Sequence, residues 1–335
     1  TPLRGRKPAC AGRIGRAAYK ALGFPLGVVA HHRQNLRFLD METMGGAKGI
    51  HTGKTPQNPG CKPARSSLKK ETMPQFAANL TMLFTELPFL ERFDAAARAD
   101  FKAVEFLFPY GFAMEDIRQK LDANGLALVL HNLPAGDWDA GERGIACLPD
   151  RVEEFRAGVA TAIGYAKGLG VGQLNCLAGK APSGVASAVL RQTFVSNLRY
   201  AAAELGAVGL KLLIEPINTY DIPGFYLSRT QQALDILDEV GADNAFVQYD
   251  IYHAQRMEGE LGATIQKNLA RIGHMQLADN PGRHEPGTGE INYAWLFKHL
   301  DAIGYQGWVG CEYKPASSTV AGLGWRQQLT QQVTN

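Results

Sequence analysis

The chain has 335 residues, of which 45% are hydrophobic, so it can bury one large core or two ordinary ones. It contains no run of about 18 consecutive apolar residues, which excludes a membrane-spanning helix. The net charge of +3 averages two unlike regions, because residues 1 to 72 carry +11, from 14 Lys or Arg and 3 Asp or Glu, whereas residues 73 to 335 carry −8.

Residues 1 to 72 are rich in Gly, Pro, Lys and Arg and show no sustained period of 2 or 3.6, so we expect a disordered basic extension there. One interpretation is leader-like or upstream sequence before a natural start at Met73. A mitochondrial presequence is another, because the segment is basic and poor in acids, and an arm for nucleic acid is a third, although few aromatic residues are present for stacking. We favour the first, which places the folded domain at residues 73 to 330.

From Met73 onward, strand-like runs alternate with helical patterns. The predicted strands are residues 75–80, 103–108, 126–132, 171–177, 210–216, 245–251, 273–278 and 307–313. The predicted helices are residues 91–101, 114–125, 151–170, 194–209, 230–241, 261–273 and 292–304. Several of these helical patterns stop at a Gly, as helices commonly do. The alternation predicts an α/β fold, a (β/α)8 TIM barrel, whose active site lies at the carboxyl ends of the strands.

A long loop, residues 132–150, follows the third predicted strand and is longer than a barrel connection requires. Loops of this length are commonly lids or binding loops, although a purely structural excursion is the alternative. We expect Trp138 to anchor such a lid, and Glu142 and Arg143 to reach the site. His131, at the end of the preceding strand, is a weak candidate for lining the pocket.

The last four predicted strands each end in an oxygen ligand, namely Glu215, Asp250, Gln276 and Glu312. Acids and amides at the ends of apolar strands are unfavourable unless something binds them, although a single one is more often a helix cap or part of a loop ion pair. Because the carboxyl ends of all barrel strands open onto one face, four such residues in consecutive units are expected to converge there. Carboxylate and amide oxygens are hard ligands that suit Mg²⁺ or Mn²⁺.

The cysteines give no sign of a disulfide framework or of thiol chemistry. They are odd in number and widely spaced, without a CxxC pair, at Cys10, Cys61, Cys147, Cys176 and Cys311. This pattern favours free thiols in a reducing compartment such as the cytoplasm. Cys311 precedes Glu312 and should point to the opposite face of its strand, as a buried core thiol.

These segments resemble the hydroxypyruvate isomerase family, within the wider xylose isomerase-like barrels that also include the ketose 3-epimerases. The resemblance extends from Met73 to about Arg326 and rests on the segments NLPAGDWDAGERGIA, LIEPINT, YDIYHAQ, HMQLADNPGRHEPGTGEINY and VGCEYKP. It implies that the four oxygen ligands bind a divalent metal and that Glu215 and Glu312 are also the catalytic acid and base. Related sugar epimerases usually have His as the third ligand, so Gln276 is typical of the hydroxypyruvate isomerase branch.

The implied reaction converts hydroxypyruvate to tartronate semialdehyde. A proton leaves the hydroxymethyl carbon and one returns to the neighbouring carbon through an enediolate, which requires a base, an acid and charge stabilisation at the oxygens. A divalent cation, Mg²⁺ or Mn²⁺, supplies that stabilisation as a Lewis acid. The residues expected to contact the substrate are His253, Arg283, His284, Lys314 and Glu142. An Arg is favoured for a bidentate grip on the substrate carboxylate, although each of these residues alone is more often structural or a solvated charge.

Other functions stay open at this point. A 2-oxo-tetronate isomerase or a ketose 3-epimerase would use the same residues with a different pocket. A metal-dependent phosphoesterase acting on damaged DNA would need a His-rich multinuclear site and a basic face, whereas residues 73 to 335 carry −8. A non-catalytic sugar-acid sensor would lack one of the two glutamates. We therefore expect a small oxo-hydroxy acid as the partner and neither nucleic acid nor a membrane, and a homo-oligomer is compatible with the sequence.

Overall fold

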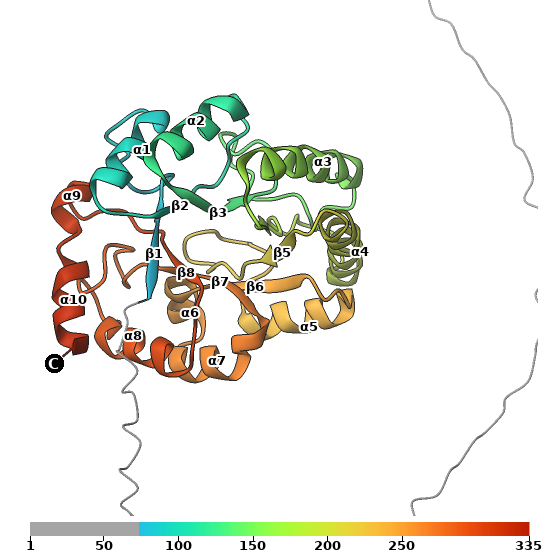
Figure 1. Ribbon diagram of the computed structural model, residues 1–335. Helices are drawn as coiled ribbons and strands as arrows, with labels where there is room; N and C mark the ends of the chain where they lie inside the picture. The colour runs from blue at the N-terminus through green and yellow to red at the C-terminus, as the bar shows by residue number, and fades with distance from the viewer. Residues whose placement is uncertain (1–73, 335) are drawn as a thin grey trace, which may run out of the picture. The chain divides into compact units, whose positions relative to one another are not determined.

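The protein is seen in a computed structural model that describes residues 74–334. Eight parallel strands follow one another in chain order and close into a barrel, with β8 paired to β1 (Figure 1). The strands are β1 (Gln75–Asn79), β2 (Ala103–Glu105), β3 (Ala127–Asn132), β4 (Gln173–Cys176), β5 (Lys211–Ile214), β6 (Ala245–Asp250), β7 (Ile272–Leu277) and β8 (Trp308–Cys311). The predicted (β/α)8 TIM barrel is confirmed.

Helices connect the strands and lie around the outside of the barrel (Figure 1). They are α1 (Phe89–Arg98), α2 (Met114–Asn124), α3 (Val152–Leu169), α4 (Ser187–Gly206), α5 (Thr230–Val240), α6 (Ile251–Met257), α7 (Leu261–Asn268), the 3-10 helix η1 (Leu269–Arg271), α8 (Tyr293–Ala302), α9 (Thr319–Gly322) and α10 (Trp325–Thr334). The helices α2, α3 and α5 each end at a left-handed glycine, Gly125, Gly170 and Gly241, with φ of 60°, 75° and 69°.

Three helices, α6, α9 and α10, were not predicted, and α4 begins at Ser187 rather than at residue 194. The first seven residues of α4 contain one buried side chain, Leu190, so the sequence there carries no helical period. The helix α6 follows β6 with no intervening loop, because Asp250 both ends the strand and caps the helix. The apolar run of the strand therefore passes into the helix without a break in the pattern.

The two faces of each strand differ in chemistry, as β1 illustrates. Phe76 points outward, and its ring packs edge-on against Phe297 of α8 and Trp325 of α10, with ring centres 5.2 and 5.0 Å away. Burial of such a side chain contributes roughly 1.5–3 kcal/mol. Asn79, three residues later, has the opposite orientation and points into the barrel, where it binds Glu105 and a second acid described below. The helices thus cover the apolar face of the strands, and the polar side chains turn inward.

The remaining sequence predictions concern the cysteines, the membrane and the extension. Cys147, Cys176 and Cys311 are free and buried, and Cys311 belongs to the apolar core as predicted. Among residues 74–334 we find no helix with the length and apolar character needed to cross a membrane. The predictions for residues 1 to 72, including Cys10 and Cys61 and the boundary at Met73, lie outside the described residues.

Candidate active site

Each strand carries a buried polar side chain at or just beyond its carboxyl end. In chain order these side chains are Asn79, Glu105, His131, Asn175, Glu215, Asp250, Gln276 and Glu312. The last four are the predicted oxygen ligands, and the structure places them at the same end of the barrel. Asn79, Glu105 and Asn175 were not predicted as site residues, because they lie in segments that we interpreted only as core strands. The available signal was an isolated acid or amide inside each apolar run.

Glu215, Asp250 and His253 form a compact group. One potential ligand atom from each lies within 4.8 Å of the others, and Nε2 of His253 is 3.8 Å from Glu215 Oε1 and 3.7 Å from Asp250 Oδ2. The carboxylate of Asp250 is oriented by α6, because its Oδ1 accepts from the backbone N–H groups of Tyr252 and His253 at 2.7 and 3.3 Å. Its Oδ2 is buried and has no hydrogen-bond partner among the described residues.

The amide of Asn218 determines which nitrogen of His253 carries the proton. Asn218 Oδ1 accepts from two backbone N–H groups of the following turn, at 3.1 and 2.8 Å, so its Nδ2 is the atom that lies 2.6 Å from His253 Nδ1. Because Nδ2 can only donate, Nδ1 is the acceptor and the proton of the neutral ring is on Nε2. Burial lowers the pKa of His253 well below its ordinary value, so the ring is neutral. His253 therefore points an N–H donor toward Glu215 and Asp250.

Arg283 reaches the same acids from the segment after β7. Its Nη2 donates to Glu312 Oε1 at 2.7 Å and lies 4.0 Å from Asp250 Oδ2, and its Nη1 is 3.6 Å from Asp221 Oδ2. The guanidinium carbon is 5.2 Å from the centre of the Tyr252 ring. Burial alone would lower the pKa of Arg283, but the surrounding carboxylates raise it, so the side chain stays charged. Arg283 is thus a buried cation held among acids.

The loop that carries Arg283 is built around Asp279, which is fully buried. The carboxylate of Asp279 accepts from the backbone N–H groups of Asn280, Gly287, Gly289 and Ile291 at 2.9, 2.8, 3.0 and 3.1 Å. A Cβ atom at Gly289 would lie 2.0 Å from the carbonyl oxygen of Asn280, so the turn requires glycine. Arg283 itself has a φ of 55°, which residues other than Gly, Asn and Asp seldom adopt. The loop holds Arg283 in one particular backbone conformation.

Burial raises the pKa of three neighbouring acids, Glu215, Asp250 and Glu312. The pKa of Glu215 is raised well above its ordinary value by burial, and the nearby charges of Glu312 and Asp250 raise it further. Burial also raises the pKa of Glu312 to about 8 and that of Asp250 to about 6, with Arg283 opposing both shifts. Closely placed carboxyl groups of this kind share protons, so the group retains a proton at neutral pH.

Two amide side chains join Glu312 to Glu105 on β2. The Nδ2 atom of Asn79 donates to Glu105 Oε1 at 2.9 Å and to Glu312 Oε2 at 3.2 Å. The Nε2 atom of Gln276 donates to the same two oxygens at 2.8 and 2.6 Å. The oxygen of the Gln276 amide instead accepts from Gln248 Nε2 at 2.7 Å. Gln276 therefore presents its nitrogen to Glu312 in this arrangement.

The predicted substrate contacts separate into two sets. His253 and Arg283 lie beside the acids, as described above. Glu142 instead binds Arg151, with 2.7 Å between Oε1 and Nη1. The Nδ1 atom of His284 donates to the carbonyl oxygen of Lys314 at 2.7 Å, and the Lys314 side chain is exposed. The contacts found for these last three residues thus do not include the acids, and their part in substrate binding stays a prediction.

The long loop after β3 packs against the chain that follows β4. The backbone N–H of Cys147 donates to the carbonyl oxygen of Ala178 at 2.8 Å, and a Cβ atom at Gly144 would lie 2.4 Å from the carbonyl oxygen of Leu177. The guanidinium carbon of Arg143 lies 4.1 Å from the centre of the Trp138 ring. These contacts anchor the loop, and its use as a lid stays a prediction.

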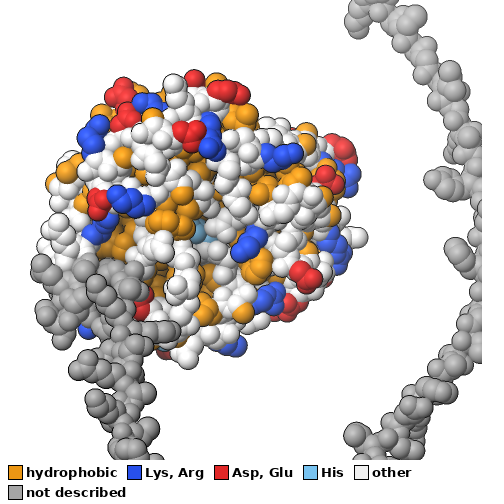
Figure 2. All heavy atoms as spheres, in the orientation of Figure 1, with side chains coloured by type: hydrophobic (Ala, Val, Ile, Leu, Met, Phe, Trp, Pro, Cys, Tyr) orange, Lys and Arg blue, Asp and Glu red, His pale blue; other side chains and the backbone are white. Residues whose placement is uncertain are grey.

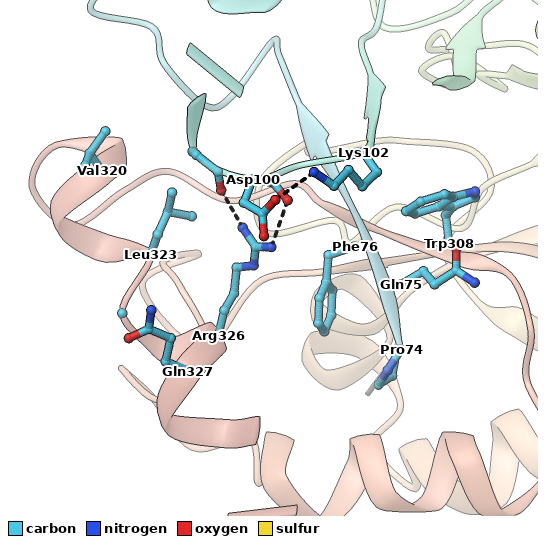
Figure 3. Close-up of a pocket in the computed structure, with 12 residues that line it drawn as sticks. Pro74, Gln75, Phe76, Asp100, Lys102, Trp308, Val320, Leu323, Arg326 and Gln327 are labelled. Atoms are coloured by element: carbon cyan, nitrogen blue, oxygen red, sulfur yellow. Dashed lines mark hydrogen bonds and ion pairs between the residues drawn. The ribbon is translucent and has the colours of Figure 1, made fainter. Parts of the chain in front are cut away.

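A cavity of about 780 Å³ opens at the other end of the barrel (Figure 3). Gln75 and Trp308, the first residues of β1 and β8, line it together with Arg326 of α10. It contains none of the four predicted ligands, and active sites of TIM barrels lie at the carboxyl ends of the strands. This cavity is therefore not the candidate active site.

The acids suit a divalent cation in charge and in available ligand atoms. Buried polar atoms almost always have a hydrogen-bond partner, yet Asp250 Oδ2 has none among the described residues. Three buried carboxyl groups, those of Glu215, Asp250 and Glu312, are expensive to keep ionised unless cations accompany them. Because His253 presents an N–H group and Gln276 an amide nitrogen, the carboxylates are the ready ligands in this arrangement.

The closed barrel, with its acids at the carboxyl ends of the strands, defines the class of protein, and residues 93–329 match the family described as xylose isomerase-like TIM barrel. The chain is 58% identical over 253 residues to hydroxypyruvate isomerase of Escherichia coli (strain K12), across 76% of this chain and 98% of that protein. It is 49% identical over 253 residues to 2-oxo-tetronate isomerase of Cupriavidus necator, across 76% and 97%. The chain belongs to the hydroxypyruvate isomerase family of these barrels and is an isomerase.

Solved structures agree on the fold. One described as AP endonuclease, family 2, from Brucella melitensis has 45% sequence identity and a TM-score of 0.75, and the match covers 76% of this chain and 99% of that one. D-Psicose 3-epimerase with D-tagatose, from Clostridium cellulolyticum H10, has 19% identity and a TM-score of 0.60, over 78% and 96%. At that identity the second likeness shows the barrel alone.

Proposed function

We propose that this isomerase interconverts hydroxypyruvate and tartronate semialdehyde through an enediolate, with Glu215 and Glu312 as acid and base and with a divalent cation. The observation that supports this best is that both glutamates are buried, have raised pKa values and lie in one group with Arg283. The identity of 58% to a hydroxypyruvate isomerase supports the substrate.

The reaction moves protons between two adjacent carbons and between their two oxygens. One glutamate takes a proton from C3, the hydroxymethyl carbon, and the electron pair of that C–H bond forms the C2–C3 double bond while the carbonyl pair moves to O2. O2 then gains a proton, and O3 loses its own as C3 becomes the aldehyde carbon. C2 receives a proton from the other glutamate, so substrate and product have the same composition.

The raised pKa values give each glutamate the state that its role needs. A carboxyl group whose pKa lies near 8, as for Glu312, holds a proton at neutral pH and can donate it. Repulsion between ionised carboxylates favours a state in which one of Glu215 and Glu312 is protonated and the other is a base. Loss and gain of a proton exchange the two roles, as a reversible isomerisation requires.

Arg283 and His253 are the residues that we assign to the substrate. A guanidinium can hold a carboxylate with two parallel hydrogen bonds, and Arg283 already binds a carboxylate oxygen of Glu312 at 2.7 Å. The Nε2–H group of His253 faces the acids and is placed to donate to a substrate oxygen.

Glu215, Asp250 and Glu312 would hold Mg²⁺ or Mn²⁺, with the amide oxygen of Gln276 as the fourth ligand. Such a cation supplies Lewis-acid stabilisation of the negative charge on the substrate oxygens when bound. Gln276 must then turn its oxygen away from Gln248. The Oε1 atom of Gln248 has no partner among the described residues, so it can accept from the Gln276 amide after both amides turn.

The test is a panel of hydroxypyruvate and 2-oxo-tetronate with Mg²⁺ or Mn²⁺ in D₂O, followed by proton NMR. We expect an aldehyde product from hydroxypyruvate and deuterium on the carbon that gains a proton. E215Q and E312Q should each lose about 10² to 10⁴ in kcat, the usual contribution of a proton-transfer group. E154Q is the matched control, since Glu154 lies in an exposed pair with Arg151. Wild-type activity in either glutamate variant would remove that residue from the mechanism.

Two alternatives have specific support and are part of the same panel. The identity of 49% to a 2-oxo-tetronate isomerase favours that substrate as the second candidate, and a higher kcat/KM for it would replace hydroxypyruvate. The Brucella melitensis structure described as an AP endonuclease favours a phosphoesterase, so an oligonucleotide with an abasic site is included. Against this, the potential metal group found among residues 74–334 has one His, and the face drawn in Figure 2 mixes acidic and basic side chains without a basic patch.

A further inference from the structure

Glu105 is a buried acid that the proposed reaction does not use. Its side chain is 0% exposed and points from β2 into the barrel, where it meets donors from two other strands. Oε1 accepts from Asn79 and Gln276, and Oε2 lies 2.6 Å from Nε2 of His274. An acid that is fully removed from water and fully supplied with donors is costly to assemble. Its position beside the candidate site suggests a role there.

The amides of Asn79 and Gln276 couple the orientation of Glu312 to the position of Glu105. The two protons of an amide NH₂ group lie in one plane at a fixed angle, so fixing the direction of one fixes the other. In both Asn79 and Gln276, the nitrogen donates to Glu105 Oε1 and to Glu312 Oε2. Glu105 therefore sets the direction of the two hydrogen bonds that hold Oε2 of Glu312.

The strand β8 leaves space for Glu105 by means of a glycine. A Cβ atom at Gly310 would lie 2.2 and 2.3 Å from the two carboxylate oxygens of Glu105. Gly310 lies in a strand and does not have a positive φ, so its backbone conformation does not require glycine. The space that Glu105 occupies is what requires glycine there. Any side chain at position 310 would push the carboxylate of Glu105 away from the two amides.

We propose that Glu105 is a positioning residue for Glu312. It acts through Asn79 in every state, and through Gln276 until that amide turns its oxygen toward a cation, and Gly310 provides the space for its carboxylate. The proposal rests on the proposed function only for the role of Glu312 in turnover. It assigns to Glu105 no contact with substrate and no proton transfer.

The test is a double-mutant cycle of E105A and G310A. Each single variant should lower kcat about 10- to 100-fold, the usual effect of removing a residue that orients a ligand or a reacting group. KM should change little, because Glu105 does not touch the substrate. In the E105A background G310A should cost nothing further, since the added Cβ atom then meets no carboxylate. E105Q keeps one oxygen that can accept from both amides, so its kcat should lie between those of E105A and the wild type.

Two controls separate positioning from a general loss of structure. N244A also removes partly buried hydrogen bonds, those from Asn244 to the carbonyl oxygens of Ala202 and Leu210, but at the amino ends of β5 and β6, away from the acids, and it should retain wild-type kcat. A turnover by E105A equal to that of the wild type, or a G310A effect of equal size with Glu or Ala at position 105, would overturn the proposal.

A crystal structure of E105A gives a readout that does not depend on turnover. We expect the Glu312 carboxylate to leave the amides of Asn79 and Gln276, and an unchanged carboxylate position would also defeat the proposal. If the wild type isomerises none of the oxo-hydroxy acids, the proposed function fails, and the position of Glu312 in E105A still decides this inference.

Discussion

Replacing Glu215 by Gln should stabilise the metal-free protein while it removes turnover. Glu215 is 4% exposed, and burial raises its pKa, helped by the charges of Glu312 and Asp250. Gln has the same shape and can still accept the hydrogen bond that Asn175 Nδ2 donates at 2.9 Å. The substitution E215Q therefore removes a crowded buried charge, leaves no cavity and keeps the acceptor for Asn175.

The size of the effect follows from the cost of such a charge. Replacing a buried ion pair by apolar residues of similar volume is often neutral or stabilises a protein by about 1–4 kcal/mol, which gives the scale of the cost of buried charge. We take about 1–2 kcal/mol, because Arg283 already offsets part of the repulsion, and this is the usual gain at strained functional sites. In a domain of this size about 1 kcal/mol shifts Tm by roughly 2–4 °C. The expected rise in Tm is therefore roughly 2–8 °C.

The difference between E215Q and the wild type should grow with pH. The pKa of Glu215 is higher in the folded chain than its ordinary value of 4.5, so the folded state binds the proton more tightly than the unfolded state does. The wild type therefore loses stability as the pH rises above that ordinary value, and the loss is complete once the pH exceeds the folded pKa. E215Q has no proton to lose at this position, so its advantage should be small near pH about 5 and largest at alkaline pH.

Thermal unfolding by circular dichroism in EDTA, at several pH values, measures this difference. E154Q is the control, and its change in stability should have the opposite sign. Arg151 lowers the pKa of Glu154, so E154Q should lose the contribution of this exposed pair, which is less than about 1 kcal/mol. Excess Mn²⁺ should give the wild type the higher Tm of the two proteins, since a cation at 100 times its Kd stabilises the wild type by about 2.7 kcal/mol and should bind E215Q less tightly. A lower Tm for E215Q than for the wild type in EDTA at alkaline pH would refute the buried-charge explanation.

Three further predictions concern the metal, the substrate and the extension. Chelation should lower isomerase activity, and Mg²⁺ or Mn²⁺ should restore it better than metals that prefer thiolates, so full activity in a verified metal-free sample would contradict the ligand set. R283M should raise KM for hydroxypyruvate about 10- to 100-fold, because charged hydrogen bonds to the substrate are lost, and the KM of R283K should lie between those of R283M and the wild type. An unchanged KM would show that Arg283 does not bind the substrate carboxylate. Deletion of residues 1 to 72 should leave Tm and activity unchanged, because a segment without apolar periodicity contributes little to a core, and a fall of several degrees would show that it packs on the barrel.

The barrel could be predicted because the sequence repeats one local pattern. Each unit has a short apolar run followed by an amphipathic helix, and glycines such as Gly125 and Gly170 mark helix ends by their left-handed φ. The failures occurred where the local signal is missing. The helix α6 starts at the residue that ends β6, and the first turns of α4 bury only Leu190.

The convergence of Glu215, Asp250, Gln276 and Glu312 could be predicted because each lies at or next to a strand end, a position that can be located along the chain. Glu105 could not, because its meaning depends on partners far away in the sequence, such as Gln276 at a separation of 171 residues. The need for glycine at position 310 is also visible only when β2 and β8 lie on either side of β1 in the closed barrel. A one-dimensional pattern gives the direction of a side chain but not the partner that it meets.

The eight buried polar side chains at the carboxyl ends of the strands differ in how completely their hydrogen-bonding atoms find partners. Around Glu312, the amides of Asn79 and Gln276 and the guanidinium of Arg283 occupy both carboxylate oxygens. On the side of β4 and β6, buried oxygen atoms of Asn175 and Asp250 have no hydrogen-bond partner among the described residues. Unpaired buried oxygens are unfavourable, whereas a fully bonded carboxylate is held in one orientation. We infer that Glu312 is held in one orientation before substrate and cation bind, whereas the buried oxygens of Asn175 and Asp250 gain their partners only when they bind.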